Sequence, residues 1–340
     1  MMLKKYLTNI GPLPIFKNKD LKFKICLGHK FKIISFGKKN PNKIFYIIRR
    51  SPGAGLFSNV TIILNHLYAC QKLNLIPVID MKNFATIYNE KNKINGTKNA
   101  WEYYFEKINN YDLSEVYKSK NAIISNTNIE NFMIKDMADK KISKFFHKIK
   151  IKKKYFKVAN SFFQKKKINK KKILGVHFRG STYKVARGHA YPFNIKIMIK
   201  TIHKLLKKYK YNKIFIVTEE KKYLKALINE FGEKCMYYKS FRMERLDLFK
   251  IYPRKNHRFK LGEEILIETI LLSKCDGLAY IKSNVISAAM MISGFKQNYH
   301  EFLLGFNSQN KFISRWLWYI KSIFPPYLGG LKIKKIKNNL

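Results

Sequence analysis

The chain has 340 residues, of which 69 are Lys or Arg and 21 are Asp or Glu, so its formal net charge is +48. A hydrophobic content of 46%, with 15% aromatic residues, is enough to build the cores of two α/β domains and excludes a disordered polycation. Only nine of the basic residues are Arg, and the Lys runs are scattered, which disfavours a nucleic-acid-binding protein and leaves attraction of a phosphate-bearing donor or an anionic membrane face.

The cysteines and the apolar stretches carry little functional signal. Cys26, Cys70, Cys235 and Cys275 lack CxxC spacing, which predicts reduced thiols rather than a zinc site or a disulfide framework. No signal peptide is visible at the N-terminus, and polar residues interrupt the most apolar late stretch, 277–295. We therefore expect a cytoplasmic protein.

The first half of the chain predicts an extension followed by an α/β lobe. Residues 1–40 are expected to form an N-terminal extension with a small hairpin, and residues 41–165 an N-terminal lobe on the acceptor side. In this lobe, strand 43–50, a glycine loop, a helix from Leu56 and strand 75–80 make a βαβ unit, and a strand at 122–125 and a basic helical segment at 131–167 follow. The aromatic residues between Asn83 and Phe105 favour core packing, with an acceptor cleft as the alternative.

The second half predicts a donor-binding lobe of alternating strands and helices. The Lys-rich run at 165–172 is the expected boundary, and residues 170–310 form the lobe. Strands are predicted at 173–178, 213–218 and 277–281, and helices at 195–209, 222–231, 263–273 and 286–293. A terminal helix at 313–323 and a basic tail occupy residues 311–340. This alternation predicts a parallel sheet with a site at the carboxyl ends of its strands.

Two groups at predicted strand ends suit phosphate binding. Gly53, Gly55 and Asn59 lie where a strand turns into a helix, although such a glycine turn is often only structural. His177 and Arg179 alternate at the end of an apolar strand, so both point to the same side. The planar guanidinium of Arg179 is suited to a diphosphate.

Three further groups have structural alternatives of comparable weight. Thr218, Glu219 and Glu220 end a strand, where carboxylates would accept hydrogen bonds from a sugar or base, or simply open the next helix. Ser283 and Asn284 precede a helix, so N-capping competes with a binding role. Glu268 lies among apolar residues and needs a partner wherever it is buried.

Together these blocks resemble the superfamily that contains the nodulation-type and α-1,6-fucosyltransferases and the protein O-fucosyltransferases, over residues 44–293. The central signature, His-x-Arg followed closely by Thr-Asp, reads here from His177 to Thr182. Thr182 stands where the family has Asp, Asn284 replaces a serine, and Glu replaces Asp at 219, 220 and 268. The segment from Asn99 to Phe105 is similar to one in bacterial surface-polysaccharide enzymes.

The resemblance implies a GT-B-like fold, with two Rossmann-like lobes whose parallel sheets face a central cleft. It implies an inverting transfer of fucose, or a related sugar, from a GDP-sugar to a surface glycan such as a lipopolysaccharide precursor, without metal or cofactor. Arg179 is then the expected catalytic residue, because it takes up charge on the departing diphosphate. The expected donor-binding residues are Gly53, Gly55, Asn59, His177, Arg179, Thr218, Glu219, Glu220, Glu268, Ser283 and Asn284.

Several assignments stay open at this stage. The general base is unassigned among Glu219, Glu220 and His189, since a threonine at 182 cannot serve as a carboxylate base. The acceptor is expected to be a glycan, with a lipid link and peripheral contact with the anionic inner face of the membrane as further expectations. Alternatives are another nucleotide-sugar donor on the same fold, or a non-catalytic relative that binds glycan or nucleic acid.

Overall fold

The computed structural model describes residues 33–125, 145–166, 172–243 and 248–338, and it divides into two compact units. The first holds residues 1–152 with 256–262, and the second holds 153–255 with 263–340. The division therefore falls before helix α6 (Lys153–Lys165) rather than in the Lys-rich run, because Phe162 of α6 packs edge-on against Phe215 of the second unit. Most of the predicted N-terminal hairpin and most of the segment 131–167 before α6 lie outside the described residues.

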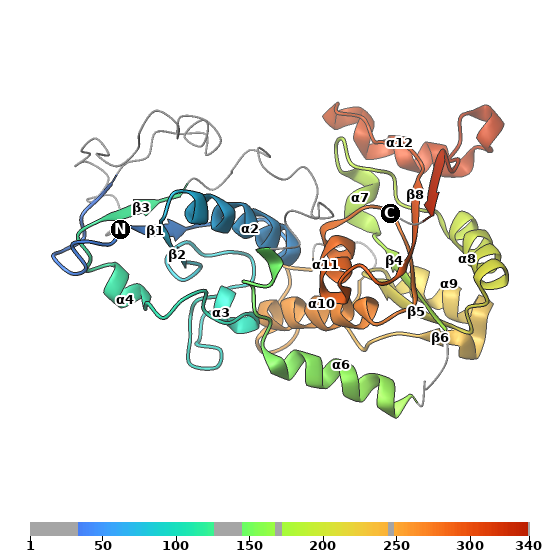
Figure 1. Ribbon diagram of the computed structural model, residues 1–340. Coiled ribbons are helices and arrows are strands. Elements are labelled where there is room, and N and C mark those ends of the chain that lie inside the picture. Colours follow the sequence, from blue (N-terminus) through green and yellow to red (C-terminus); the bar gives the residue numbers. More distant parts are fainter. Residues whose placement is uncertain (1–32, 126–144, 167–171, 244–247, 339–340) are drawn as a thin grey trace. The chain divides into compact units, whose positions relative to one another are not determined.

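The first unit is built on a parallel sheet of three strands in the order β2-β1-β3. β1 (Phe45–Ile48) is central, between β2 (Ile76–Ile79) and β3 (Ala122–Ile124), and all four of its residues are buried. A parallel strand covered on both faces is expected to be apolar throughout, as this one is. Helix α2 (Leu56–Lys72) makes the crossover from β1 to β2, so the predicted βαβ unit is confirmed (Figure 1).

The aromatic segment of the first unit is core. Helix α3 (Trp101–Tyr104) and Phe105 bury their aromatic rings, and Trp101 stacks on Phe105 with 4.2 Å between ring centroids. Tyr104 stacks on Phe259 at 5.8 Å and donates its hydroxyl hydrogen to the Phe259 carbonyl. Packing was the favoured interpretation and is confirmed, because these rings are too buried to line an open cleft. A short helix, α4 (Leu113–Val116), precedes β3.

The second unit contains a sheet of six strands in the order β6-β5-β4-β7-β8-β9. Its strands are β4 (Ile173–Phe178), β5 (Lys213–Thr218), β6 (Cys235–Met236), β7 (Gly277–Tyr280), β8 (Asn298–Leu303) and β9 (Lys335–Asn338). The first five in sequence run parallel, and β9 pairs antiparallel with β8. The predicted parallel sheet is confirmed, whereas β6, β8 and β9 were not predicted, and the basic tail contributes an edge strand.

Helices connect these strands, and all of them lie in the second unit except the start of one helix, residues 257–262, which belongs to the first unit. They are α7 (Ser181–Val185), α8 (Ile195–Tyr209), α9 (Lys221–Phe231), α10 (His257–Ser273), α11 (Asn284–Ser293) and α12 (Lys311–Ile323), with short 3₁₀ turns η3 (Gly232–Lys234) and η4 (Pro326–Leu328). Asn194 caps α8 by accepting a hydrogen bond from the Ile197 amide at 2.8 Å, and Lys210 ends it in the left-handed conformation. Such local signals explain why the predicted bounds of α8 are confirmed to the residue.

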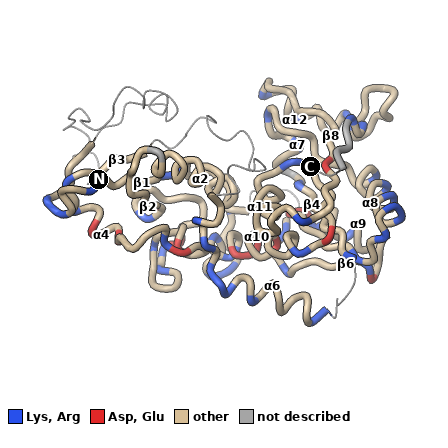
Figure 2. The backbone as a smooth tube through the Cα atoms, in the orientation of Figure 1, with Lys and Arg blue, Asp and Glu red and all other residues tan. Residues whose placement is uncertain are grey.

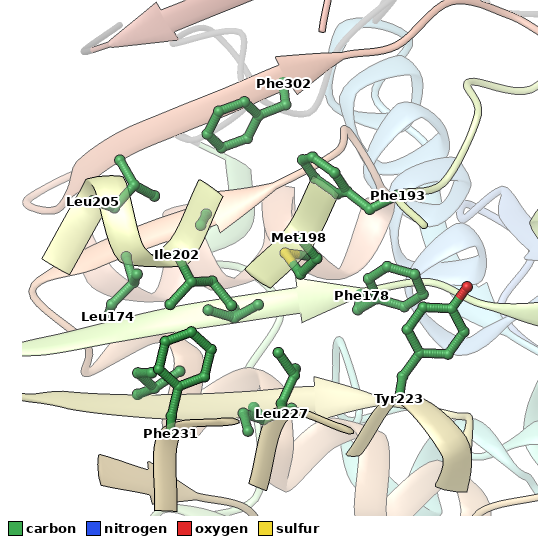
Figure 3. Close-up of a cluster of buried hydrophobic side chains, with 14 of the residues drawn as sticks. Leu174, Phe178, Phe193, Met198, Ile202, Leu205, Tyr223, Leu227, Phe231 and Phe302 are labelled. Carbon is green, nitrogen blue, oxygen red and sulfur yellow. The ribbon is translucent and has the colours of Figure 1, made fainter. Parts of the chain in front are cut away.

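The core of the second unit fixes the carboxyl end of β4. Phe178, the last residue of β4, stacks on Tyr223 of α9 with 3.9 Å between ring centroids. Met198 and Ile202 of α8 and Leu227 of α9 pack in the same cluster (Figure 3). Because Phe178 is anchored from this face, its neighbours His177 and Arg179 are directed to the other face of the sheet.

Candidate functional site

The strand order of the second unit reverses beside β4. From β4 the chain proceeds outward through β5 and β6, and it returns to the other side of β4 for β7 and β8. In an open α/β sheet such a reversal leaves a crevice at the carboxyl ends of the two strands, and ligands bind there. The described structure has a pocket at this place, with about 250 Å³ of empty space that is open to solvent. Its lining is made of His177, Phe178, Arg179, Tyr183, Pro192, Phe193, Ile281 and Lys282.

His177 is a buried, neutral histidine in this pocket. Its side chain is 5% exposed, and burial, assisted by the nearby charge of Arg179, lowers the pKa of its imidazole to about 3. Its Nδ1 lies 3.4 Å from Oγ of Ser283. The imidazole is therefore uncharged at neutral pH and serves as a hydrogen-bonding group rather than a cation.

Arg179 presents a guanidinium without an acidic partner. It lies over the ring of Tyr183 at 4.0 Å, and its Nη1 donates to the Tyr183 hydroxyl at 3.1 Å. No carboxylate among the described residues lies within 4.0 Å of its nitrogens. The side chain is half-buried and held by one aromatic ring, so most of its donors are available to an anion.

Two carboxylates contact the residues that follow Arg179 in the sequence. Glu220 forms a buried ion pair with Lys184 at 2.7 Å, and burial raises the pKa of its carboxyl while Lys184 opposes that rise. Glu219 accepts from the Gly180 amide at 3.3 Å and from the Thr182 hydroxyl at 3.4 Å. Glu220 is therefore already held by an ion pair, whereas Glu219 brings a carboxylate beside Thr182.

Ser283 and Asn284 open helix α11 at the other side of the pocket. The Ser283 hydroxyl caps the helix by accepting from the Ile286 amide at 3.4 Å, which confirms the capping interpretation. Asn284 is exposed. The helix has ten residues, has no acidic side chain in its first turn, and directs its positive end toward the region of His177 through Ser283.

Glu268 and Thr218 are engaged away from this pocket. The Glu268 carboxylate accepts from Arg242 Nη2 at 2.8 Å and from the Ser240 hydroxyl at 2.6 Å. Burial raises the pKa of Glu268 to about 7, against the opposing effects of Arg242 and Ser240. Arg242 also donates to the Thr218 carbonyl at 2.9 Å. The expectation that Glu268 needs a partner is confirmed, and that partner anchors the segment after β6.

The glycine loop belongs to the first unit. Gly55 precedes α2 without a side-chain cap, and the Leu56 amide donates to the Tyr88 hydroxyl at 2.7 Å. A Cβ at Gly53 would meet nothing within 4 Å, so no packing inside the unit demands glycine there. Asn59 is buried and accepts from Nε of Arg50 at 3.1 Å. The open space around Gly53 is what a close approach by a phosphate requires.

Several site residues were absent from the sequence prediction. Tyr183 and Lys282 line the pocket, but an isolated aromatic ring and one Lys among sixty gave no signal. Arg50 is 5% exposed, and burial lowers the pKa of its guanidinium to about 10. Arg50 ends the predicted strand 43–50, and that position could have marked it as a candidate site residue from the sequence. His189 is exposed, and its Nδ1 lies 2.9 Å from the Arg187 carbonyl oxygen.

The positive charge of the described residues is dispersed, and their acidic, His and Cys side chains form no metal-binding cluster. Lys and Arg are spread over both units rather than gathered on one element (Figure 2). Within the described part of the chain, no group of three or more His, Cys, Asp or Glu side chains is placed to hold a metal ion. The metal-independent mechanism stays a prediction.

Comparison with known proteins identifies the fold. NodZ α-1,6-fucosyltransferase co-crystallised with GDP matches with a TM-score of 0.50 and 14% identity, over 77% of this chain and 96% of NodZ. NodZ from Bradyrhizobium gives the same TM-score and identity over 76% of this chain and 96% of that chain. The chain therefore has the fold seen in NodZ. The predicted α/β class with parallel sheets is thereby confirmed.

The remaining comparisons do not extend this result beyond the fold. POFUT1 in complex with GDP matches this chain with a TM-score of 0.35 and 10% identity, over 84% of this chain and 79% of POFUT1. No protein-family model matches the sequence, and no curated protein sequence matches it. The likeness to NodZ, at 14% identity, establishes the fold and leaves the activity to be argued from the site.

Proposed function

We propose that this protein is a glycosyltransferase that transfers fucose, or a closely related sugar, from a GDP-sugar to a glycan acceptor. The observation that carries the proposal is the acid-free guanidinium of Arg179 in a pocket at the strand-order reversal of a fucosyltransferase fold. The NodZ structures of this fold were obtained with GDP and with GDP-fucose, which supports a guanosine-diphosphate donor.

Stabilisation of the leaving group is the role proposed for Arg179. When the bond between sugar and diphosphate breaks, negative charge accumulates on the phosphate oxygens, and a fixed cation there lowers the barrier. Two guanidinium N–H groups can bind two phosphate oxygens at once. Stacking on Tyr183 fixes the plane of the guanidinium, so little orientation is lost when the donor binds. Lys282, which also lines the pocket, supplies a second positive charge.

His177 and helix α11 are proposed to hold the donor near Arg179. Because the imidazole is neutral, it binds sugar or phosphate oxygens without competing with Arg179 for the charge. Ser283 fixes the start of α11, whose free amides and dipole favour an anion at that end. In the first unit, the open backbone at Gly53 would separately allow a phosphate to approach the start of α2.

Glu219 is the general base that we propose. Glu220 is held by Lys184, and His189 is exposed and bonded to a backbone carbonyl, so neither is as well placed. Glu219 sits within 3.4 Å of Thr182 and thereby returns a carboxylate to the neighbourhood of the missing aspartate. Its test is a comparison of transfer with donor binding: Glu219→Gln should lower kcat and leave GDP binding nearly intact.

Nucleotide binding is the first test. Thermal-shift and calorimetric titrations with GDP and GDP-fucose, beside UDP and CMP counterparts, should show stabilisation by the guanosine nucleotides alone. Arg179→Ala should reduce transfer on the order of 10²-fold or more, with a partial recovery in Arg179→Lys. Lys204→Ala, which removes an exposed cation from helix α8 of the same unit, is the control and should keep full activity.

Each outcome has a distinct meaning. Near-normal transfer by Arg179→Ala would refute the role of the guanidinium. Binding of UDP-sugars instead of GDP-sugars would assign another donor to the same fold. Donor binding with neither transfer nor hydrolysis, over a panel of lipid-linked and free oligosaccharides, would instead indicate a non-catalytic glycan-binding protein.

A further inference from the structure

Helix α12 is apolar on both of its faces. Its inner face is seated on the second unit, where Trp318 is buried and donates from its indole nitrogen to the Pro192 carbonyl at 2.9 Å. Ser314 is buried on the same side, and Leu317 packs against the core. A peripheral helix normally turns a polar face to water once one face is seated. This helix does not.

The outer face of α12 carries large side chains exposed to solvent. They recur at helical spacing and comprise Phe312 (75% exposed), Ile313 (51%), Trp316 (67%), Tyr319 (44%), Ile320 (49%) and Ile323 (82%). The stripe continues into the turn after the helix, where Tyr327 is 84% and Leu328 is 61% exposed. We call this surface, from Phe312 to Leu328, the α12 patch. It lies at the outer edge of the second unit (Figure 1).

Positive charge accompanies the patch. After Glu301 the sequence holds no Asp or Glu, and it holds seven Lys or Arg residues: Lys311, Arg315, Lys321, Lys332, Lys334, Lys335 and Lys337. An outward stripe of Trp, Tyr, Phe and Ile on a helix whose charged residues are all basic is typical of helices that lie in the plane of an anionic bilayer. Trp and Tyr favour the headgroup level, and Lys and Arg are attracted by the anionic surface.

We propose that the α12 patch docks the protein onto an anionic lipid bilayer. The helix lies flat, with the outer face of α12 in the headgroup region and the basic residues at the phosphate level. Among the described residues no helix is long and apolar enough to cross a membrane, so the contact is peripheral. Docking would hold the second unit at the surface where a lipid-linked acceptor would be found.

Vesicle binding tests this inference without any nucleotide, so its result is independent of the proposed transferase activity. The protein should sediment with vesicles rich in phosphatidylglycerol and much less with phosphatidylcholine alone, and high salt should weaken the binding. The triple variant Phe312→Ser/Trp316→Ser/Ile323→Ser should lower partitioning on the order of 10²-fold. Tyr252→Ser, at an aromatic residue that is 54% exposed elsewhere, is the matched control and should bind as the wild type does.

The charge contribution has its own pair of variants. Lys311→Gln/Arg315→Gln should reduce binding to anionic vesicles roughly tenfold. Lys204→Gln/Lys207→Gln, which removes two exposed charges from α8, should change it little. Equal losses in both pairs would refute the local role of the patch and leave only the general charge of the protein.

Trp316 reports the geometry of docking. Of the three Trp residues, Trp101 and Trp318 are 2% and 5% exposed, so quenching by brominated lipids should act on Trp316 and disappear in Trp316→Phe. Unchanged fluorescence on anionic vesicles would overturn the proposal. It would also be overturned if the wild type sedimented as a dimer that the triple variant dissolved, with no vesicle binding, because the patch would then join two copies of the chain.

Discussion

Acid should destabilise this protein through His177, and replacement of that residue should remove the effect. Burial lowers the pKa of the folded-state imidazole to about 3, against 6.5 for the ordinary side chain. Between these values the unfolded chain binds a proton that the folded protein excludes, so stability rises with pH across this window. The contribution is complete above pH 6.5 and is lost progressively as pH falls toward 3.

The size of the effect follows from the shift. One pH unit of differential protonation corresponds to about 1.4 kcal/mol, so at pH 5 the wild type should have lost about 2 kcal/mol through His177 alone. That loss is a large fraction of the 5–15 kcal/mol that typically separates folded from unfolded domains, as an order of magnitude. Other titrating groups also make the free energy of unfolding depend on pH, but their contributions are the same in a variant that lacks only the His177 imidazole.

Urea unfolding of the wild type and of His177→Gln, at pH values from about 7.5 to about 5, measures how the free energy of unfolding of each protein depends on pH. The free energy of unfolding should converge between the two proteins as pH falls, by about 2 kcal/mol at pH 5. Parallel curves would refute a buried neutral histidine. So would an inflection near pH 6.5 in the activity profile of the wild type that His177→Gln lacks.

Three further predictions concern the buried ion pair of Lys184 with Glu220 and the glycines at 180 and 53. Lys184→Met should destabilise the protein by about 3–5 kcal/mol in chemical denaturation, because it leaves Glu220 buried without its ion-pair partner. The double variant Lys184→Met/Glu220→Leu should recover much of that loss. Equal stabilities of the single and double variants would contradict this prediction. Gly180→Ala places a Cβ 2.2 Å from Glu220 Oε1 and should cost about 1–3 kcal/mol. Gly53→Ala should keep the wild-type stability yet weaken GDP binding, and unchanged binding would mean that the loop stays clear of the donor.

Elements with strong local signals were predictable from sequence. β4, β5 and α8 match the predicted ranges to the residue because apolar periodicity and caps agree there. β8 was missed since its polar His300 reads as exposed, whereas the fold buries it against the Tyr211 hydroxyl, 2.9 Å from its Nε2. β9 is an edge strand rich in Lys, a composition that keeps an edge from pairing with other chains. The same composition lacks the apolar residues by which strands are predicted from sequence.

Site positions were predictable where they follow from a strand end, and their partners were not. His177 and Arg179 fall in one pocket because the last residues of a parallel strand meet the crevice. The ion pairs Lys184–Glu220 and Arg242–Glu268 join residues 36 and 26 positions apart. No local pattern specifies such pairs, since folding alone brings their members together. Glu220 and Glu268 therefore looked like ligand-binding candidates, whereas each neutralises a buried cation.

A chain with 69 basic residues makes any single cation a weak argument, so what distinguishes Arg179 must be its surroundings. Arg242 and Arg254 of the same unit are neutralised by Glu268 and Glu264, at 2.8 Å and 2.5 Å. Arg179 is half-buried like Arg254, yet it contacts an aromatic ring instead of an acid. Partial burial of a charge costs free energy, and the second unit, which offers carboxylates to Arg242 and Arg254, leaves Arg179 for an anion from outside. A bound diphosphate would supply that anion.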